Sequence, residues 1–382
     1  MSPGCSRLTP TSGRKWYELF MGRKIKIPGD KKKVAVLFRL DANRKTGLGH
    51  LSRCLNLAEE CMNRGWAAYF AGSFDHNART RIATAGGEIL RNWPEEYDTT
   101  LEPPRELALL HKAAEVTGAR VLVTDCYTLP ADYHLEAREL FPLVVMIDDL
   151  NVAPPAADIL INHNIFAPHL AYRPVFPETK LLLGPRYALL PAAIRTARKK
   201  EIRPEVKNIL VSLGGSDPPG LTLKVVKALQ LSWVGTVWNV VAGPGFAKRE
   251  ILKDLAASDR RVNFHYAPGT LLPLLAESDL VICAGGVTAI EAAATGTPAL
   301  ILILAENQQP NAKEMDRQGI AVNLGWGGAT PVEAMAAEIL ALARDVERRT
   351  TMSETGRALF DGYGPVRCAD AIQELLGSGE VK

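Results

Sequence analysis

The sequence predicts an α/β protein with two Rossmann-like, doubly wound domains that face each other across a cleft. Short runs rich in valine, isoleucine and leucine alternate with helical patterns along the chain, which is typical of parallel βαβ units. The length of 382 residues exceeds that of one typical core, so two domains are expected. Ligands of such sheets bind beyond the carboxyl ends of the strands, and two facing sheets therefore predict a ligand cleft.

The N-terminal domain is expected over residues 34–200. Its first two strands enclose an amphipathic helix, because apolar residues recur at helical spacing from Leu51 to Met62 and Gly65 follows as a stop signal. The strands predicted from apolar runs are Val34–Leu40, Ala67–Ala71, Val121–Thr124 and Leu143–Ile147.

Residues 151–204 are rich in proline and hold only two short apolar runs, Ile159–Ile161 and Leu181–Leu183. The basic stretch Arg195–Arg203 then predicts an interdomain linker. The C-terminal domain is expected over residues 201–382. Its predicted strands are Asn208–Leu213, Thr236–Ala242, Arg261–His265, Leu280–Cys283, Ala299–Leu304 and Ala321–Leu324, and its last helices lie near Pro331–Asp345, Met352–Phe360 and Val366–Leu376.

Composition excludes several classes of protein. The net charge of +3 is too small to favour a nucleic-acid partner. The six cysteines are scattered and form no C-x-x-C pair, which argues against a disulfide framework or zinc site and favours a reducing cytoplasm. The longest apolar run, Ala299–Ala305, is too short for a transmembrane helix.

The N-terminal segment is unusual in another way. Residues 14–33 hold eight lysines or arginines together with Trp16, Tyr17, Phe20 and Met21. This pattern fits a disordered arm or a start codon assigned too early. A basic, aromatic anchor at a membrane surface is the alternative that stays open.

The first candidate site loop is Gly47-Leu48-Gly49-His50, between the first strand and the first helix. Its glycines let the backbone turn sharply, and the helix start presents free N–H groups to an anion. A dinucleotide fingerprint would have a third glycine where Ser52 stands. A lone histidine is usually structural or solvated, but at a helix start after Gly-x-Gly, His50 is expected to face the cleft as a catalytic group.

Three further loops follow strands of the second domain. The glycine pair Gly214-Gly215, followed by Ser216-Asp217, fits close approach to a phosphate or a plain turn. The segment Gly285–Glu291 opens a helix, and its Thr288-x-x-Glu291 fits a capping box, which needs no ligand. In the alternative interpretation, the N–H groups of the helix start bind a pyrophosphate and Glu291 binds a ribose. The polar residues Glu306–Gln309 fit a sugar or phosphate contact, or a helix cap.

Metal and cofactor motifs are missing from the sequence. There is no Asp-x-Asp, no Walker motif and no histidine pair at metal-ligand spacing. A metal-independent enzyme without a cofactor is therefore expected.

Taken in order, these motifs resemble the nucleotide-sugar hydrolase family of pseudaminic acid biosynthesis, whose members release UDP from UDP-2,4-diacetamido-2,4,6-trideoxy-β-L-altropyranose. The same pattern is similar to the spore-coat polysaccharide biosynthesis protein G group and, more distantly, to the lipid II-forming N-acetylglucosaminyltransferase of the GT-B fold. The resemblance covers about residues 34 to 325. It is carried by Phe38–Ala42, Gly47–Cys54, Asp125–Tyr127, Ile147–Asp149, Leu183–Leu190, Leu213–Pro218, Gly285–Glu291 and Glu306–Gln308.

The resemblance implies a GT-B-like fold and a role for several residues. His50 matches the catalytic histidine of the family, and Tyr127 and Asn307 match residues of its sugar site. Val287 stands where serine is frequent in the family, and Cys126 where histidine is. The Cys126 change is near the sugar and puts the identity of the substrate in doubt more than the type of reaction. The nucleotide loop implied by the match is Gly285, Gly286, Val287, Thr288 and Glu291, and the other candidate contacts are Gly47, Gly49, Asp41, Gln308, Gly214 and Gly215.

The predicted reaction is hydrolysis of a UDP-sugar at its anomeric carbon, with inversion. Neutral His50 is suited to take the proton of the attacking water near neutral pH, and Asp41 is a candidate to orient its ring. Amides of the glycine loops would neutralise charge on the leaving UDP. A glycosyltransferase that uses an acceptor hydroxyl instead of water, and a non-catalytic protein that binds a nucleotide sugar, remain alternatives.

Overall fold

A computed structural model describes residues 34–43, 46–91, 93, 103–127, 129–198, 201–215, 217, 220–232, 236–243 and 245–377 of the chain. The basic segment 14–33 lies outside the described residues, as do Ser216 and Pro218 of the first glycine loop in the second domain. The alternatives for the N-terminal segment therefore stay predictions. Among the described residues, no helix combines the length and apolar character needed to cross a bilayer.

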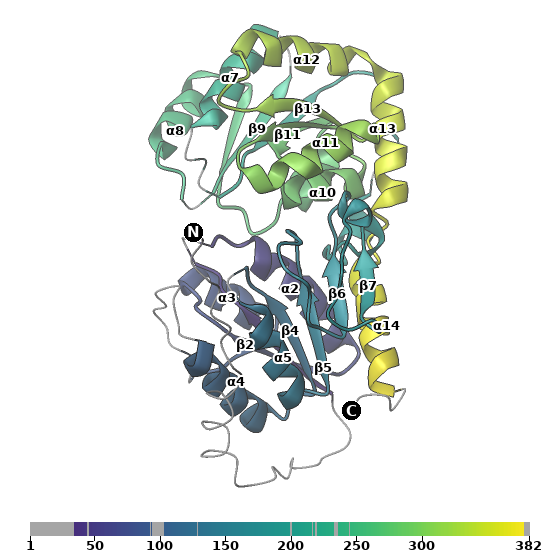
Figure 1. The fold of residues 1–382 in the computed structure, drawn as a ribbon. Helices are drawn as coiled ribbons and strands as arrows, with labels where there is room; N and C mark the ends of the chain where they lie inside the picture. The colour runs from purple at the N-terminus through teal and green to yellow at the C-terminus, as the bar shows by residue number, and fades with distance from the viewer. Residues whose placement is uncertain are drawn as a thin grey trace, which may run out of the picture. The chain divides into compact units, whose positions relative to one another are not determined.

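The first sheet has seven parallel strands, arranged β3-β2-β1-β4-β5-β6-β7 (Figure 1). The two apolar runs of the proline-rich segment form β6 and β7, so this segment extends the first sheet. The two-residue β3 lies at an edge and was not predicted, because so short a strand leaves no periodic pattern. The strands are β1 (Ala35–Leu40), β2 (Ala67–Ala71), β3 (Glu88–Ile89), β4 (Val121–Asp125), β5 (Leu143–Ile147), β6 (Ile159–Asn162) and β7 (Lys180–Leu183).

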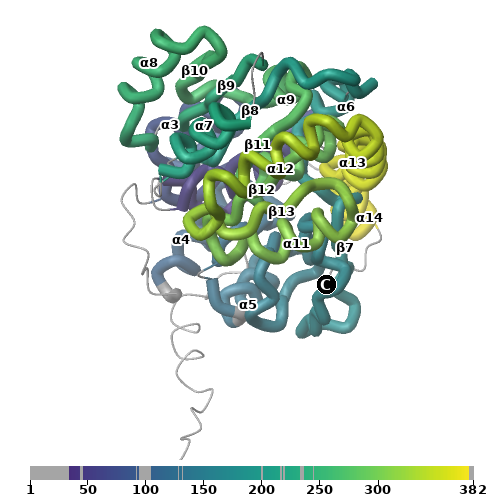
Figure 2. The backbone as a smooth tube through the Cα atoms, turned by 90° about the horizontal axis from the view of Figure 1, so that it is seen from above, coloured from purple at the N-terminus to yellow at the C-terminus, as the bar shows by residue number. Residues whose placement is uncertain are grey.

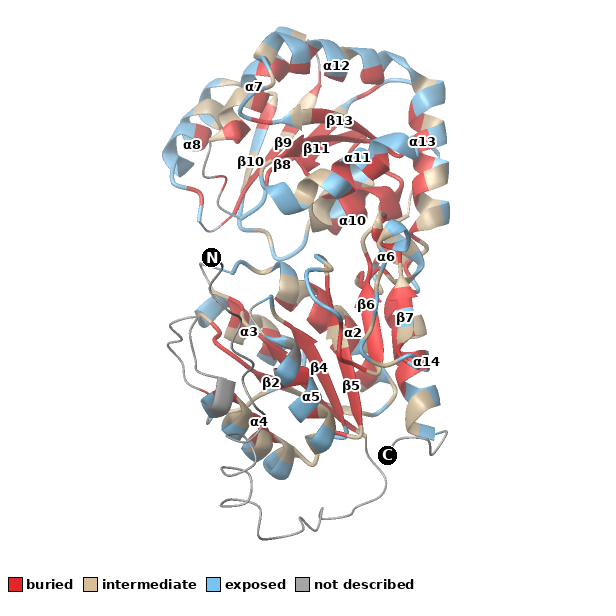
Figure 3. Ribbon diagram, viewed as in Figure 1, coloured by how far each residue is buried: buried red, intermediate tan, exposed pale blue. Residues whose placement is uncertain are grey.

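Helices cover both faces of this sheet, and its strands are buried along most of their length (Figure 3). Val36 and Phe38 of β1 pack on one face, whereas Leu37 packs on the other, as the two-residue period of a strand requires. Helices α2 (Gly49–Asn63), α3 (His76–Thr84) and α14 (Gly364–Gly377) cover the first face, and α4 (Pro103–Thr117) and α5 (Ala131–Leu140) the second.

The second sheet has six parallel strands in the order β10-β9-β8-β11-β12-β13. Helices α7 (Leu221–Ser232) and α12 (Val332–Arg344) pack together on one face (Figure 2), and α10 (Val287–Thr295) and α11 (Gln309–Arg317) lie on the other (Figure 1). The remaining helices include α8 (Arg249–Ser258), α9 (Leu272–Glu277) and α13 (Val346–Leu359). The strands are β8 (Asn208–Ser212), β9 (Val237–Ala242), β10 (Val262–Tyr266), β11 (Leu280–Ala284), β12 (Ala299–Ile303) and β13 (Ala321–Trp326).

The last helix, α14, packs against the first sheet, although the sequence assigned it with the second. Cys368 and Ile372 of α14 belong to the same apolar cluster as the first-sheet strands, and Arg64 of α2 donates to the carbonyl of Val366. At the start of α14, a Cβ on Gly364 would lie 2.0 Å from the carbonyl oxygen of Ala188, so only glycine permits this approach. Apolar periodicity identified the helix but carried no information about which sheet it covers.

The order of strands in each sheet reverses at one point, between β1 and β4 and between β8 and β11. At this switch point the chain leaves adjacent strands toward opposite faces, which opens a crevice beyond their carboxyl ends. Leu40 at the end of β1 pairs with Asp125 at the end of β4, and Ser212 of β8 pairs with Cys283 of β11. The loops that follow β1, β4, β8 and β11, which carry most of the predicted site residues, therefore leave the sheets at the switch points, whereas Asn307 and Gln308 follow β12.

Candidate active site

His50 lies in the first turn of α2, the helix that follows the loop after β1. Gly47 has a φ of +75°, which a residue with a side chain rarely adopts, so this glycine permits the turn into the helix. The imidazole is mostly buried, and its edge meets the ring of Tyr127 with centroids 4.7 Å apart. Its Nδ1 lies 3.7 Å from Oδ1 of Asp125 at the end of β4.

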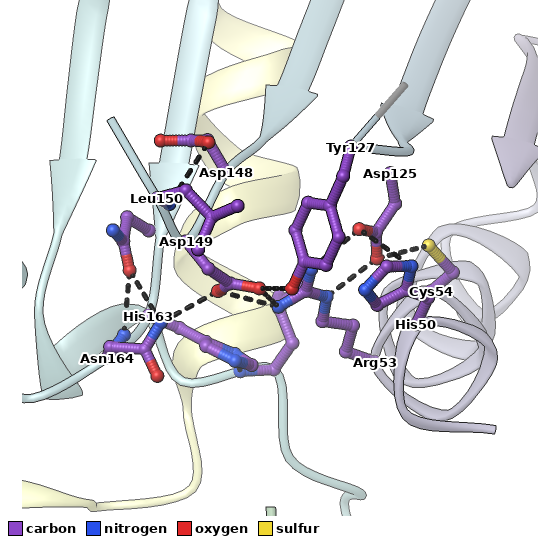
Figure 4. A network of polar contacts seen from close by, with 12 residues as sticks. His50, Arg53, Cys54, Asp125, Tyr127, Asp148, Asp149, Leu150, His163 and Asn164 are labelled. Carbon is purple, nitrogen blue, oxygen red and sulfur yellow. Dashed lines mark hydrogen bonds and ion pairs between the residues drawn. The ribbon is translucent and has the colours of Figure 1, made fainter. Parts of the chain in front are cut away.

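Arg53 lies one turn after His50 on the same helix and contacts two carboxylates (Figure 4). Its Nε and Nη2 donate to Oδ2 and Oδ1 of Asp125, each at 2.6 Å. Its Nη1 donates to both oxygens of Asp149, which follows β5, each at 2.8 Å. The bidentate geometry fixes the plane of the Asp125 carboxylate that faces His50.

These three groups stabilise one another's charges inside the protein. Burial lowers the pKa of the Arg53 guanidinium, but the carboxylates of Asp125 and Asp149 outweigh it, so the pKa lies well above its ordinary value. Burial raises the pKa of Asp149, but the Arg53 charge dominates and holds that pKa well below its usual range. Arg53 and Asp149 are therefore charged at neutral pH.

Tyr127 and Asn164 complete the contacts of Asp149. The Tyr127 hydroxyl donates to Oδ2 at 2.6 Å, and the Asn164 amide donates to Oδ1 at 2.7 Å. Burial and the neighbouring Asp149 charge raise the pKa of Tyr127, so its hydroxyl stays protonated. The Tyr127 side chain is nevertheless 44% exposed, which leaves one face of the ring free to contact a ligand.

His163, one residue before Asn164, is structural. It is buried, and its Nδ1 accepts from the backbone N–H of Leu189 at 3.2 Å. Burial and the Arg53 charge lower its pKa to about 4, so the ring is neutral. The carbonyl of Leu189 accepts from Asn56 of α2. The motif Leu183–Leu190 thus connects the end of β6 to the helix that carries His50.

Asp41 does not contact His50, contrary to the prediction. Its Oδ1 accepts from Arg39 at 3.0 Å and from the backbone N–H of Ser73 at 2.8 Å, and its Oδ2 lies 3.8 Å from the Cys126 sulfur. Asp125 is the carboxylate behind the imidazole instead. Local sequence could not separate the two, because both aspartates end neighbouring strands of the sheet.

The Gly285 loop leaves β11 and enters α10 with its first N–H groups free of any side-chain cap. Gly286 is the N-cap residue and Val287 begins the helix, so Thr288 lies inside the first turn and the predicted capping box is not formed. Glu291 lies one turn further on. Burial raises its pKa to about 7, and the charge of Arg81 on α3 opposes the rise.

The Glu306–Gln308 turn packs against this loop. A Cβ on Gly285 would lie 3.2 Å from the Cβ of Gln308, and the Gln308 Oε1 accepts from the N–H of Leu304. Asn307 is exposed beside it. Asn311 of α11 is buried, donates to the carbonyl of Gly285 at 3.3 Å and accepts from the N–H of Ile165 at 3.4 Å, so it connects this loop with the first sheet.

The Gly214-Gly215 loop has a structural explanation. A Cβ on Gly243 would lie 2.3 Å from the carbonyl of Gly215, so the two backbones are in direct contact. The carboxylate of Asp217 accepts from the N–H groups of Leu221 and Thr222 at the start of α7. An anion at this helix start would meet the charge of Asp217, which favours the plain turn over the phosphate loop.

Five polar residues of this site had no role predicted from the sequence. Arg53, Asp149 and Asn164 form the contacts described above, Asp125 lies behind His50, and Asn311 connects the loops. Of these, Arg53, Asp125 and Asp149 lie within the motifs named earlier. Two signals were available in the sequence. Arg53 follows His50 by three residues on a helix, and Asp125 and Asp149 end two neighbouring parallel strands.

Comparisons with known proteins support the fold. Residues 243–360 match the family model of the glycosyltransferase family 28 C-terminal domain. The chain is 25% identical to the spore coat polysaccharide biosynthesis protein SpsG of Bacillus subtilis (strain 168) over 344 residues, which cover 88% of this chain and 96% of that protein.

A more distant relative has a name that states an activity. The chain is 22% identical over 289 residues to the UDP-2,4-diacetamido-2,4,6-trideoxy-beta-L-altropyranose hydrolase of Campylobacter jejuni subsp. jejuni serotype O:2, which covers 75% of this chain and 98% of that enzyme. The crystal structure of MurG from Acinetobacter baumannii superposes with a TM-score of 0.60 at 16% identity, over 90% of this chain and 99% of that one. The predicted fold class is thus confirmed: the chain has two Rossmann-like α/β domains in the arrangement of GT-B glycosyltransferases.

Proposed function

We propose that this chain hydrolyses a UDP-activated amino or deoxy sugar at the anomeric carbon and releases UDP and the free sugar, in nonulosonic acid or surface polysaccharide biosynthesis. The observation that carries the proposal is the pair of His50 and Asp125, whose Nδ1 and Oδ1 lie 3.7 Å apart at the switch point of the first sheet. The name of the Campylobacter jejuni relative supports the choice of reaction.

In the proposed reaction, water attacks the anomeric carbon from the side opposite the nucleotide. A carbon–oxygen bond forms to water as the bond to the UDP oxygen breaks, and Nε2 of His50 takes the proton that water loses. Asp125 then stabilises the imidazolium through its negative charge. General base catalysis of this kind contributes about 10²- to 10⁴-fold to the rate.

The leaving UDP would bind at the start of α10. The N–H groups around Gly286, Val287 and Thr288 have no side-chain cap and lie at the positive end of the helix dipole. Donors arranged in advance in this way stabilise the charge that develops on the β-phosphate. Glu291, one turn into the helix, is suited to accept hydrogen bonds from the ribose hydroxyls.

The sugar would lie between His50 and the residues opposite it. Tyr127 offers an exposed ring face, and Asn307 offers an exposed amide that can donate and accept hydrogen bonds. The backbone of Gly47 and Gly49 is exposed beside His50 and lacks side chains that would obstruct a ligand.

A glycosyltransferase is the second candidate, favoured by the family 28 match over residues 243–360. The same His50 could deprotonate an acceptor hydroxyl instead of water. The two functions differ only in the nucleophile, so the distinction depends on whether water or a second substrate occupies the space beside the imidazole.

A product assay separates these functions. Purified protein is incubated with a panel of nucleotide sugars, with and without acceptors, and the products are identified by mass spectrometry. Rapid UDP release without an acceptor supports hydrolysis, whereas release that requires an acceptor supports transfer. In His50→Ala, turnover should be lost while UDP still binds by calorimetry; full activity of that variant would remove His50 from the mechanism.

A further inference from the structure

We propose that Arg53 is a positioning residue, whose single guanidinium fixes both the carboxylate behind His50 and the carboxylate behind Tyr127. The proposal rests on the proposed function, because it assigns His50 the role of base and Tyr127 a contact with the sugar. It adds that the Arg53 guanidinium holds both of these groups in place. A substitution of Arg53 should therefore disturb both the base and the contact with the sugar.

The contacts of Arg53 leave each carboxylate with a defined orientation. Asp125 is fully buried and receives a fork of two hydrogen bonds from Nε and Nη2, each 2.6 Å long. The second fork, from Nη1 to both oxygens of Asp149, is 2.8 Å on each side. Arg53 itself is only 5% exposed, so water cannot replace these contacts easily.

Each carboxylate in turn contacts, and so orients, a residue that faces the site. Oδ1 of Asp125 receives Nη2 of Arg53 and faces Nδ1 of His50 at 3.7 Å. Oδ2 of Asp149 receives Nη1 of Arg53 and the hydroxyl of Tyr127 at 2.6 Å. The rings of His50 and Tyr127 then meet edge to face, with an interplanar angle of 89°.

The charges of the cluster suit a base that becomes protonated. One arginine and two aspartates give a net charge of −1 while His50 is neutral, and the sum becomes zero when His50 takes a proton. Arg53 thus neutralises one of the two buried carboxylate charges, and one negative charge remains to stabilise the imidazolium. Lysine could not replace it, because an ammonium is a point charge without the planar fork that holds two carboxylates.

The position of Asp125 also selects the tautomer of His50. A carboxylate that faces Nδ1 favours the tautomer with the proton on Nδ1, which leaves the lone pair of Nε2 free to accept a proton from water. If Arg53 no longer holds Asp125, this preference should weaken. The tautomer can be observed by NMR without any turnover.

A buried arginine between two carboxylates is not by itself a sign of such a role in this protein. Arg39 on β1 is also buried and binds Asp41 and Glu106, at 3.0 and 2.6 Å. Asp41, however, accepts from the backbone N–H of Ser73 and lies near the Cys126 sulfur, not beside His50. Arg53 differs because the two carboxylates that it binds contact His50 and Tyr127. The test therefore needs a readout other than stability.

The test compares Arg53→Lys with Arg64→Lys, the same substitution at the C-terminal end of the same helix. Arg64 is the C-cap residue of α2 and pairs with Glu60 and Asp370, away from the predicted site. In Arg53→Lys we expect UDP release to fall about 100-fold, as for a catalytic group displaced by about 1 Å. The acid limb of the pH–rate profile should move, the Nδ1–H tautomer of His50 should lose its dominance in ¹⁵N spectra, and UDP affinity should stay unchanged. Arg64→Lys should match the wild type in all four.

An Arg53→Lys protein that keeps both the wild-type tautomer and the wild-type pH profile overturns the proposal. If Arg53→Lys does not fold, Asp149→Asn decides instead: it weakens the second fork, and the KM for the nucleotide sugar should rise about fivefold. An unchanged KM in Asp149→Asn then overturns the proposal. If the wild-type protein turns over no nucleotide sugar, the proposed function fails, whereas the tautomer comparison still decides whether Arg53 positions His50 through Asp125.

Discussion

Replacing Asp125 with asparagine should remove the charge behind His50 with almost no change in shape. Asp125 is fully buried, and His50 is mostly buried, so little water screens the pair. The variant keeps one oxygen that can accept from Arg53 and exchanges the other for an amide nitrogen. It therefore loses one of the two hydrogen bonds from Arg53 together with the negative charge that stabilises the protonated imidazole during the reaction.

The size of the effect follows from the 3.7 Å separation of Nδ1 and Oδ1. Coulomb's law gives about 1 kcal/mol for this distance with the dielectric constant of water and about 4 kcal/mol at an effective constant of 20. These energies correspond to a fall in kcat of about 5- to 1000-fold. Because Asp125 is fully buried and His50 is mostly buried, we expect a loss of about 100-fold, and removal of the charge should move the acid limb of the pH–rate profile toward lower pH.

The assay is UDP release from the nucleotide sugar that the product panel identifies, measured between pH 5 and pH 9. Asp158→Asn is the matched control, because Asp158 is also paired with an arginine, Arg138, but precedes β6 at the opposite end of the sheet. Calorimetric UDP binding checks that the second domain is intact. If Asp125→Asn keeps a wild-type kcat and pH profile, the charge of Asp125 has no part in catalysis.

Three further predictions address other parts of the molecule. Tyr127→Phe removes the hydrogen bond to Asp149, so the KM for the nucleotide sugar should rise about tenfold in steady-state kinetics. Burial raises the pKa of Glu291 to about 7, so its carboxyl group is mostly protonated at pH 6 and mostly ionised at pH 8. Glu291→Gln should therefore weaken UDP binding, measured by calorimetry, about tenfold at pH 8 and little at pH 6. Gly364→Ala forces a Cβ to within 2.0 Å of the Ala188 carbonyl and should lower the free energy of unfolding by about 2 to 3 kcal/mol in urea denaturation.

The fold could be predicted well from the sequence because each element carries its own local signal. Strands β11 and β12 are buried at every residue, and Leu280–Ala284 and Ala299–Ile303 are therefore continuous apolar runs. Two features had no local signal. The strand Glu88–Ile89 has only two residues, and the contact of α14 with the first sheet depends on how distant segments pack.

The site could be predicted only in part, for a related reason. His50 stood out because its glycine turn and helix start are neighbours in the sequence. Asp125, Arg53 and Asp149 come together only when β1, β4 and β5 lie side by side, and nothing local indicates which aspartate will face the imidazole. The assignment of Asp41 failed for this reason, since Arg39 and the N–H of Ser73 already occupy its Oδ1.

The two glycine loops of the second sheet look alike in sequence, but electrostatics separates them. At the start of α7, the carboxylate of Asp217 already accepts from two backbone N–H groups. At the start of α10, there is no side-chain cap and no acidic residue in the first turn, and Glu291 lies one turn deeper. A diphosphate at α7 would have to displace a like charge, whereas at α10 it would meet free donors and a favourable dipole. This difference favours α10 over α7 as the place for the proposed leaving group. The close approach of the two backbones requires glycine at position 243, where a Cβ would lie 2.3 Å from the Gly215 carbonyl oxygen.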